Sequence, residues 1–179
     1  DQSAVPGLSS LSDESHLAGK VKKEQPVLVV LGNPPYSVSS ANKSKFIDGY
    51  LDRKESIDKR GRRRTLNVYI KGILDDYKEA VSSEGNIQPL SDDYIKFIRF
   101  AHWKIDNAGE GVIGMITNNS YLSGLIHRGM RKSLLESFNE IYILNLHGNS
   151  RLGEKSPDGS KDENVFDIMQ GVSIAIFLK

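Results

Sequence analysis

The stretch VLVVLGNPPYS, residues 27–37, joins five aliphatic residues to a glycine, an asparagine, two prolines and a tyrosine. A short continuous aliphatic run is typical of a buried strand, and the prolines end it because proline has no N–H to donate to a sheet. The stretch therefore predicts a strand over residues 27–31 that brings a polar side chain and an aromatic ring to the carboxyl edge of a sheet. In open α/β sheets this edge is where ligands bind.

Helical and strand patterns alternate along the rest of the chain. Apolar residues at helical spacing predict helices over residues 9–23, 66–82, 91–107 and 120–139. Apolar and β-branched runs predict strands over residues 111–117, 140–146 and 171–178. Residues 37–64 have no clear period, so we expect a long loop with irregular helix there.

This order of elements predicts an α/β fold. The near-continuous apolar run at residues 111–117 is typical of a strand covered on both faces, which implies helices on either side of the sheet. The last two strands follow each other so closely that we expect an antiparallel hairpin with a long loop. Four strands make a small open sheet, so we also expect a further part of the sheet to lie outside this chain.

Composition narrows the class of protein. The length of 179 residues suits about one domain. Because 24 Lys and Arg face 23 Asp and Glu, any affinity for an anion must come from local patches. The absence of cysteine excludes a disulfide framework, thiolate zinc sites and a cysteine nucleophile. No apolar run approaches the roughly 18 residues of a membrane span and no signal-peptide pattern opens the sequence, so we expect a cytoplasmic protein with no membrane partner.

The turn after the first strand offers two hydrogen-bond acceptors, the side-chain oxygen of Asn33 and the carbonyl of Pro34, on a backbone that the prolines restrict. Two fixed acceptors suit the NH2 group of a nucleobase, because accepting both hydrogens favours a pyramidal nitrogen with a localised lone pair. Tyr36 would stack on the base, which is worth about 1–3 kcal/mol and offsets much of the few kcal/mol needed to unstack a base from a duplex. These residues therefore predict a site for an extruded base.

The sequence GNPPY after a hydrophobic strand resembles the [DNS]-P-P-[YFW] motif of S-adenosylmethionine-dependent amino-methyltransferases, and N-P-P-Y is the form usual for adenine-N6 DNA methyltransferases. Three later stretches resemble elements that follow this motif in restriction-modification enzymes, especially the single-polypeptide type ISP group and related type II-like enzymes: VIGMITNNSYL, HRGMRKSLLESFNEIYILNLHG and DENVFDIMQGVSIAIFLK. The resemblance covers most of the chain. It implies part of a class I (Rossmann-like) methyltransferase sheet, with about four strands flanked by helices and the last strands antiparallel.

The resemblance also implies roles for single residues. Asn33, Pro34 and Tyr36 match the positions that contact the amine and stack on the base, and Pro35 shapes the turn, so these four are the catalytic candidates. Phe166 matches an aromatic residue that packs on the flipped base in related adenine enzymes. Residues 117–119 match the end of the next strand, which borders the target pocket, and receive no catalytic role.

Enzymes of this group carry a glycine-rich F-x-G-x-G-type loop and an acidic residue upstream of the motif, and these hold S-adenosylmethionine. Before Val27 the chain has only Gly7 and Gly19. We therefore expect residues 1–26 to be an amino-terminal segment with a helix and residues 27–179 to be the target-base half of a catalytic domain, its fourth to seventh strands. Such a fragment of a longer bacterial or archaeal polypeptide would be inactive alone, and the missing initial Met agrees with this expectation.

The resemblance implies two kinds of partner. Double-stranded DNA is the first. The second is the remainder of the same polypeptide, which would include the donor-binding half and helicase, nuclease and target-recognition regions. Since the strand at residues 27–31 would pair with the donor-binding half, its edge is expected to be bare or covered by another segment or chain.

Five cations within six residues form the basic cluster: Lys59, Arg60, Arg62, Arg63 and Arg64. Their charge and their expected proximity to the base site favour contact with DNA phosphates. Three carboxylates beside them fit a solvated loop equally well: Asp52, Glu55 and Asp58. Both interpretations stay open at this point.

Two further functions compete with DNA methylation. The same acceptors would hold a carboxamide in a protein-glutamine methyltransferase, although the long excursion over residues 37–110 and the basic cluster count against it. A DNA-binding module without catalysis is the third possibility. No metal site is expected, because the four histidines lack metal-ligand spacing: His16, His102, His127 and His147.

Overall fold

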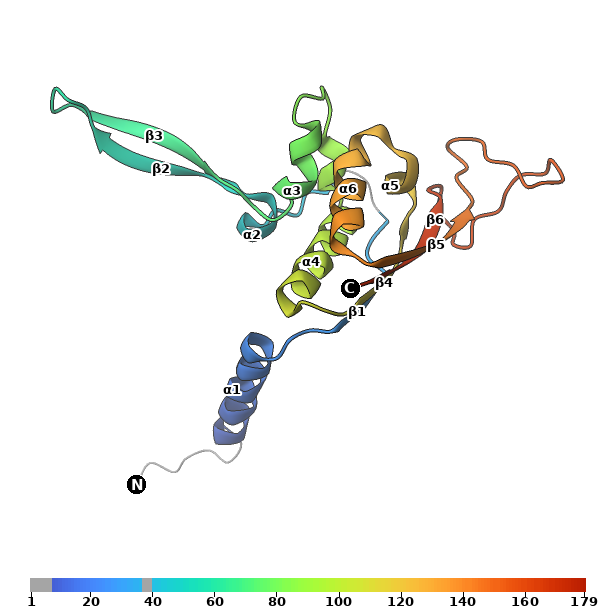
Figure 1. The fold of residues 1–179 in the computed structure, drawn as a ribbon, viewed down its shortest axis with the longest axis horizontal. Coiled ribbons are helices and arrows are strands. Elements are labelled where there is room, and N and C mark those ends of the chain that lie inside the picture. The colour runs from blue at the N-terminus through green and yellow to red at the C-terminus, as the bar shows by residue number, and fades with distance from the viewer. Residues whose placement is uncertain (1–7, 37–39) are drawn as a thin grey trace.

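The centre of the molecule is a four-stranded sheet (Figure 1), whose strands lie in the spatial order β1 (Val29–Gly32), β4 (Val112–Asn118), β6 (Val172–Leu178) and β5 (Glu140–His147). β1 and β4 are parallel, whereas β6 is antiparallel to both of its neighbours. The four predicted strands and the closing antiparallel hairpin are confirmed, with β1 beginning two residues later than expected. The computed structural model describes residues 8–36 and 40–179, and the side chains of residues 8–12 and 22–24 also fall outside the description.

One face of this sheet forms the hydrophobic core. The register pairs Ile113 with Phe177 and Met115 with Ala175, so these four buried side chains point to the same face. They pack against apolar residues of two helices, α4 (Asp93–Ala108) and α6 (Arg128–Ser137). Burying each large side chain stabilises the fold by about 1.5–3 kcal/mol, which makes this layer the main source of stability.

The opposite face of the sheet is apolar and exposed. Leu31, Ile176 and Tyr142 occupy one row across the strands, and they are 76%, 41% and 58% exposed. Val29 and Leu144 extend the same surface and are each 58% exposed. The apolar run of β4 predicts cover on both faces, but within residues 8–36 and 40–179 helices cover only one.

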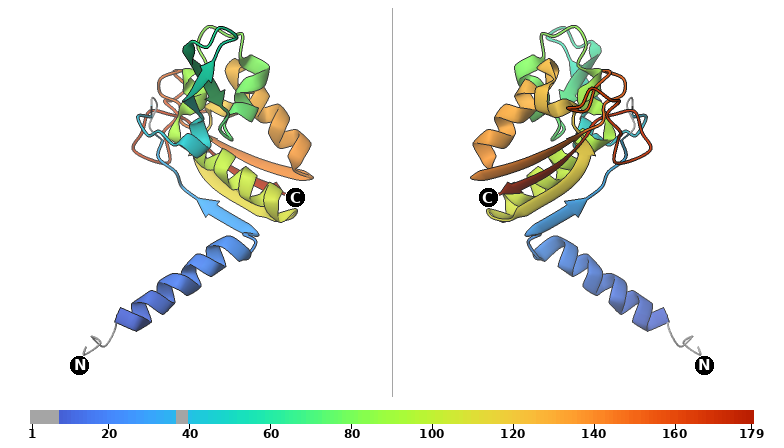
Figure 2. Two further views of the ribbon diagram at one scale, coloured as in Figure 1. Left: turned by 90° about the vertical axis from the view of Figure 1, so that its left-hand side faces the viewer. Right: turned by 90° about the vertical axis from the view of Figure 1, so that its right-hand side faces the viewer.

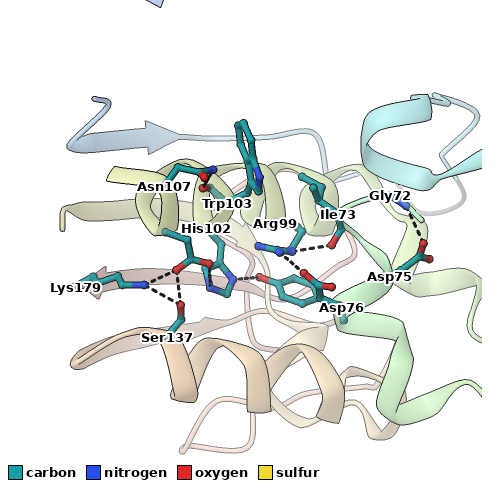
Figure 3. Close-up of polar contacts among 12 residues, drawn as sticks. Gly72, Ile73, Asp75, Asp76, Arg99, His102, Trp103, Asn107, Ser137 and Lys179 are labelled. Atoms are coloured by element: carbon teal, nitrogen blue, oxygen red, sulfur yellow. Dashed lines mark hydrogen bonds and ion pairs between the residues drawn. The ribbon is translucent and has the colours of Figure 1, made fainter. Parts of the chain in front are cut away.

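A chain of polar contacts joins the helical layer to Lys179, which follows β6 (Figure 3). The hydroxyl of Tyr77 lies 3.0 Å from His102 Nδ1, and His102 Nε2 lies 3.1 Å from a carboxylate oxygen of Asp106, outside hydrogen-bond geometry. The other oxygen of Asp106 accepts hydrogen bonds from Ser137 at 2.5 Å and from Lys179 at 2.6 Å. Burial lowers the pKa of His102 to about 4, so its ring is neutral at pH 7.

Residues 37–70 differ most from the expectation. In place of a loop and the start of a helix, the described residues form α2 (Lys45–Asp48) and a two-stranded ribbon of β2 (Tyr50–Ile57) and β3 (Arg63–Ile70). Only α3 (Asp75–Lys78) and η1 (Glu79–Val81) remain of the helix predicted over residues 66–82. The apolar residues there fit a helical period, but eight cross-strand pairs and the strand preference of Val68, Tyr69 and Ile70 favour the ribbon.

The other helices are close to their predicted positions. α1 (Leu8–Glu24) follows residues 9–23 and leads away from the β1 edge of the sheet (Figure 2). After η2 (Gln88–Ser91), α4 ends as predicted at Gly109, whose left-handed φ of 85° favours glycine. The helix predicted over residues 120–139 is interrupted at Gly124, which is extended, so α5 (Ser120–Ser123) and η3 (Leu125–His127) precede α6. No helix in the described part of the chain has both the length and the apolar composition that a membrane crossing requires.

Candidate functional site

The turn after β1 has a buried proline between two exposed residues. Pro34 is buried, while the side chains of Asn33 and Pro35 are exposed. Gly32 lies directly over Met115, since a Cβ at this position would be 2.7 Å from the Met115 sulfur. The amide of Asn33 therefore stands on a packed support at the carboxyl end of β1, as the sequence predicts.

Tyr36 folds back over this turn. Its hydroxyl donates a hydrogen bond of 2.5 Å to the side-chain oxygen of Asn33. Burial raises the pKa of Tyr36, so the phenol keeps its proton at neutral pH. The contact uses one lone pair of the Asn33 oxygen and leaves the second for another donor.

Phe166, which lies far from this turn in the sequence, is its neighbour in space. The ring centroids of Tyr36 and Phe166 are 5.5 Å apart and the rings are inclined by 41°, within the range of aromatic contacts. Phe166 is 38% exposed and Tyr36 is half-buried, so both rings remain accessible from outside. The structure thus brings together the two residues predicted to stack on a base.

The loop between β5 and β6 holds Phe166 in place through Asn164. The side-chain oxygen of Asn164 accepts the Phe166 N–H at 2.9 Å, and its NH2 group donates to the carbonyls of Gly148 and Gln170 at 2.9 and 2.6 Å. Asp162 accepts the Gly148 N–H at 2.9 Å. Sequence reasoning missed Asn164. The available signal was the D-E-N run before the aromatic residue, because Asp and Asn side chains commonly bond nearby backbone groups.

Residues 117–119 fasten the end of β4 to this loop. The Asn119 N–H donates to the Gly171 carbonyl, and the Asn119 amide donates to the side chain of Asn145, both at 2.9 Å. Gly171 is packed so closely on Asn119 that a Cβ there would be 2.5 Å from its amide nitrogen. Asn118 is buried and its oxygen accepts the Ser120 N–H. These contacts give the segment a structural role.

An open cavity of about 470 Å³ lies beside Phe166. Residues of the β5–β6 loop line it, and they include Lys161, Asp162, Asn164 and Phe166. Its volume lies within the range of small-molecule sites. Phe166 lines this cavity and also contacts Tyr36, so it lies between the cavity and the turn after β1.

The basic cluster is not part of this site. Lys59, Arg60 and Arg62 lie in the turn between β2 and β3, and Arg63 and Arg64 begin β3. Figure 1 shows that this end of the ribbon is remote from the central sheet. The expected proximity of the cluster to the base site is therefore wrong, and only its charge still favours contact with DNA.

Three side chains with cation-binding chemistry gather at the base of the β5–β6 loop. His147 Nδ1 lies 3.5 Å from Glu154 Oε1, and potential ligand atoms of His147, Glu154 and Asp162 lie within 4.8 Å of one another. The carboxylates also brace the loop, since Glu154 accepts the Asn149 N–H at 2.7 Å and Asp162 accepts that of Gly148. We assign this group to loop structure.

Residues 8–28, the described segment before β1, do not fit the methyl donor. Gly19 lies within the regular helix α1, and Gly7 lies outside the described residues. A helix offers its backbone N–H groups to its own carbonyls, whereas a donor loop must present them to a ligand. The described residues before β1 therefore present no glycine-rich loop.

The chain is similar to segments of proteins whose structures have been solved. No family model and no curated protein sequence matches the chain. Among solved structures, the ATP-dependent Type ISP restriction-modification enzyme LlaBIII bound to DNA is similar over 100% of this chain and 10% of its own, with 33% identity and a TM-score of 0.65. The DrdV–DNA complex is similar over 95% of this chain and 15% of its own, with 26% identity and a TM-score of 0.63.

A nuclease-deletion mutant of the Type ISP restriction-modification enzyme LlaGI, in complex with a DNA substrate mimic, shares the fold. It is similar over 100% of this chain and 13% of its own, with 24% identity and a TM-score of 0.64. The chain thus spans between a tenth and a sixth of the length of these proteins. It resembles one segment of restriction-modification enzymes.

Proposed function

We propose that this chain is the target-base half of an adenine-N6 DNA methyltransferase belonging to a restriction-modification enzyme. The observation that carries the proposal is the exposed amide of Asn33 at the carboxyl end of β1, with the rings of Tyr36 and Phe166 beside it. The similarity to restriction-modification enzymes over the whole chain supports it.

In this proposal the turn after β1 holds the amino group of an extruded adenine. The Asn33 side-chain oxygen and the Pro34 carbonyl each accept one of its hydrogens, which localises the nitrogen lone pair. The buried Pro34 and the packing of Gly32 on Met115 keep the acceptors from moving away. Acceptors held in advance need no reorganisation during the reaction, which is the usual origin of electrostatic catalysis.

The two aromatic rings hold the base itself. Because Tyr36 and Phe166 are already in contact, a flat base enters between them only if one ring moves. The Tyr36 hydroxyl is hydrogen-bonded to Asn33, whereas Phe166 borders an open cavity, so we assign the movement to the Phe166 side chain. Displacing Phe166 toward the cavity of about 470 Å³ would open space for an adenine.

S-adenosylmethionine would supply the methyl group, and residues outside this chain would hold it. The outer edge of β1, which no strand of the described residues pairs, and the exposed sheet face carrying Leu31 are suited to bind the donor half of the same polypeptide. Pairing there would cover an apolar edge that otherwise invites aggregation.

Labelled methyl transfer tests the proposal. The full-length polypeptide that contains this chain is incubated with duplex DNA and S-adenosylmethionine carrying a labelled methyl group. Label on adenine is expected. Label on protein glutamine would indicate a glutamine methyltransferase, and duplex binding without transfer would indicate a DNA-binding module.

Variants of Asn33 test the site within the same assay. Asn33→Ala removes an acceptor and is expected to lower kcat by about 10²–10³-fold. Asn33→Asp keeps an acceptor oxygen and should retain more activity than the alanine variant. Asn107→Ala is the matched control, because Asn107 is exposed near the end of α4 and only donates to the Trp103 carbonyl at 2.7 Å. Equal losses in Asn33→Ala and Asn107→Ala would contradict the assignment.

A further inference from the structure

The β2–β3 ribbon is an arm that has no hydrophobic core of its own. It extends away from the sheet and its layer of helices (Figure 1), and most of its side chains are exposed. Leu51, Ile57, Leu66 and Tyr69 are 67%, 72%, 56% and 50% exposed. An isolated two-stranded ribbon is marginally stable in water, so this arm is suited to contact a further surface.

The base of the arm is fixed to the body. Gly72 packs against Gly49 so closely that a Cβ at Gly72 would be 2.2 Å from the Gly49 nitrogen. The Tyr69 hydroxyl donates to the Asp48 carbonyl at 2.9 Å, and the Ile73 N–H donates to the Phe46 carbonyl at 3.0 Å. These contacts join both ends of the ribbon to α2, so its direction is set by packed backbone.

The tip of the arm is shaped by Asp58. One carboxylate oxygen accepts the N–H groups of Arg60 and Arg62 at 2.8 and 3.0 Å. The other oxygen pairs with the Nε atoms of Arg62 and Arg64 at 3.1 and 3.5 Å. Backbone hydrogen bonding from Arg62 contributes most to holding the pKa of Asp58 below its usual value, so the carboxylate stays charged near neutral pH.

The remaining cations of the tip are exposed and have no counter-charge among the described residues. Residues 52–64 contain seven Lys and Arg against three Asp and Glu. No carboxylate of the described residues lies within salt-bridge distance of Lys59, Arg60 or Arg63. The tip is therefore a local positive patch on a chain whose net charge is only +1.

Both faces of the ribbon combine cations with apolar side chains. The register places Arg63 opposite Ile57 on one face and Lys54 opposite Leu66 on the other. Cations on both faces suit a groove bounded by phosphates on each side.

We propose that the β2–β3 ribbon inserts into the major groove of duplex DNA, with Lys59, Arg60 and Arg63 on the phosphates and Ile57 toward the base edges. This inference rests on DNA as the substrate of the proposed function. The major groove is about 12 Å wide and admits a two-stranded ribbon, and apolar side chains contact the methyl group of thymine there. Eight residues of strand extend about 26 Å, which carries the tip well beyond the body.

The salt dependence of duplex binding tests the phosphate contacts. In the full-length polypeptide, the combined substitution Lys59→Gln, Arg60→Gln and Arg63→Gln is expected to lower the slope of log affinity against log salt by between two and three, since each phosphate contact contributes about 0.9. The control combines Lys104→Gln and Lys132→Gln on α4 and α6 and should leave the slope unchanged. An unchanged slope in the ribbon variant would overturn the proposal.

Substitution of Asp58 tests the proposal by strengthening the binding of duplex DNA instead of weakening it. Asp58→Asn keeps an oxygen for the backbone N–H groups but releases Arg62 and Arg64 from their ion pairs. Duplex binding is expected to become tighter and more salt-dependent. Asp58→Ala also removes the turn contacts and should bind less tightly than Asp58→Asn. Equal affinities for the two variants would contradict a preformed tip.

A photo-crosslinking residue identifies the surface that the arm contacts. Benzoylphenylalanine in place of Ile57 is expected to crosslink to bases of the duplex, whereas the same residue in place of Leu135, which is 70% exposed on α6, is not. Crosslinking of position 57 to protein alone would overturn the proposal. Binding and crosslinking are measured without S-adenosylmethionine, so a failure of the methylation proposal would leave these results interpretable.

Discussion

The hydrogen bond between Tyr36 and Asn33 couples the two side chains that we assign to the base. It uses one lone pair of the same oxygen that would accept a hydrogen of the adenine amine. The contact holds the Asn33 amide in a defined orientation before a base arrives. It also means that the hydroxyl and the ring of Tyr36 have separable roles.

Two substitutions of Tyr36 separate these roles. Tyr36→Phe keeps the ring and is expected to hold an extruded base nearly as well as Tyr36. Tyr36→Ala loses the stacking, worth about 1–3 kcal/mol, which corresponds to about a 5–150-fold weaker hold on the base. The fluorescence of 2-aminopurine at the target position of a duplex, bound to the full-length polypeptide, reports how far the base is extruded. A Tyr36→Phe variant as defective as Tyr36→Ala would contradict the stacking role.

Two buried histidines make the fold sensitive to acid. Burial lowers the pKa values of His102 and His127 to about 4, and neither ring nitrogen of His127 has a hydrogen-bond partner among the described residues. In the unfolded chain these rings bind protons below about pH 6.5. The unfolded state thus binds more protons between about pH 4 and 6.5, so the free energy of unfolding falls as pH is lowered through this window.

The size of the effect follows from the pKa difference. Each histidine contributes up to about 1.4 kcal/mol per pH unit within the window. Urea unfolding of the protein at pH 7.5 and pH 5 measures the loss. His127→Gln should reduce the pH dependence by about half, because glutamine does not titrate. Equal stability at the two pH values would show that these rings are accessible to water.

At the scale of elements, the β5–β6 loop acts as the support of Phe166. Three hydrogen bonds converge on the side chain of Asn164, and the loop is also tied to the end of β4 through Asn119 and Gly171. Asn164 fixes the backbone N–H of Phe166, so a shift of the ring would come from rotation of the Phe166 side chain. This combination suits a ring that must shift to admit a base.

Asn164→Ala tests this support. The substitution removes all three hydrogen bonds, so we expect faster proteolysis of the segment between β5 and β6 and lower methyl transfer by the full-length polypeptide. Asn149→Ala is the matched control in the same loop, because the Asn149 side chain accepts only the Leu152 N–H. If both variants are cleaved at the rate of the unaltered loop, Asn164 does not organise it.

One face of the central sheet is covered by helices, and the other face is exposed. The outer edge of β1, which no described strand pairs, and the apolar surface around Leu31 and Ile176 are exposed, and such apolar patches commonly mark interaction sites. The described residues provide no helix to cover it. We expect another segment of the same polypeptide to complete this side.

Leu31→Asp should therefore have opposite effects in two settings. In the 179-residue chain it is expected to reduce self-association, measured by analytical ultracentrifugation, because a charge on an edge strand opposes pairing. In the full-length polypeptide it should destabilise the fold by about 2–5 kcal/mol, measured by thermal or chemical unfolding, because it would bury a charge in an interface. Leu135→Asp on the exposed side of α6 is the control and should change neither. An effect of the same sign in both settings would contradict an interface on this face.

Local patterns in the sequence were sufficient for the central sheet. The aliphatic runs of β1, β4 and β6, the proline turn after β1 and the glycine after α4 each act through backbone preferences within a few residues. The helix over residues 66–82 was wrong because the apolar spacing there also satisfies a ribbon, and the choice depends on pairing with residues 50–57. A segment with no clear period cannot reveal its pairing partner by itself.

In the candidate site, too, local sequence determines some features and tertiary structure determines the others. The motif N-P-P-Y and its position after β1 follow from the chain alone, since two consecutive prolines offer no N–H to a neighbouring strand. The contact of Tyr36 with Phe166, the hydrogen bonds of Asn164 and the distance of the basic tip from the sheet are decided by tertiary structure. These contacts join residues that are far apart in sequence and that meet only when one face of the sheet is buried. Hydrophobic burial determines which face lies inside. No local sequence motif records which distant residues then become neighbours.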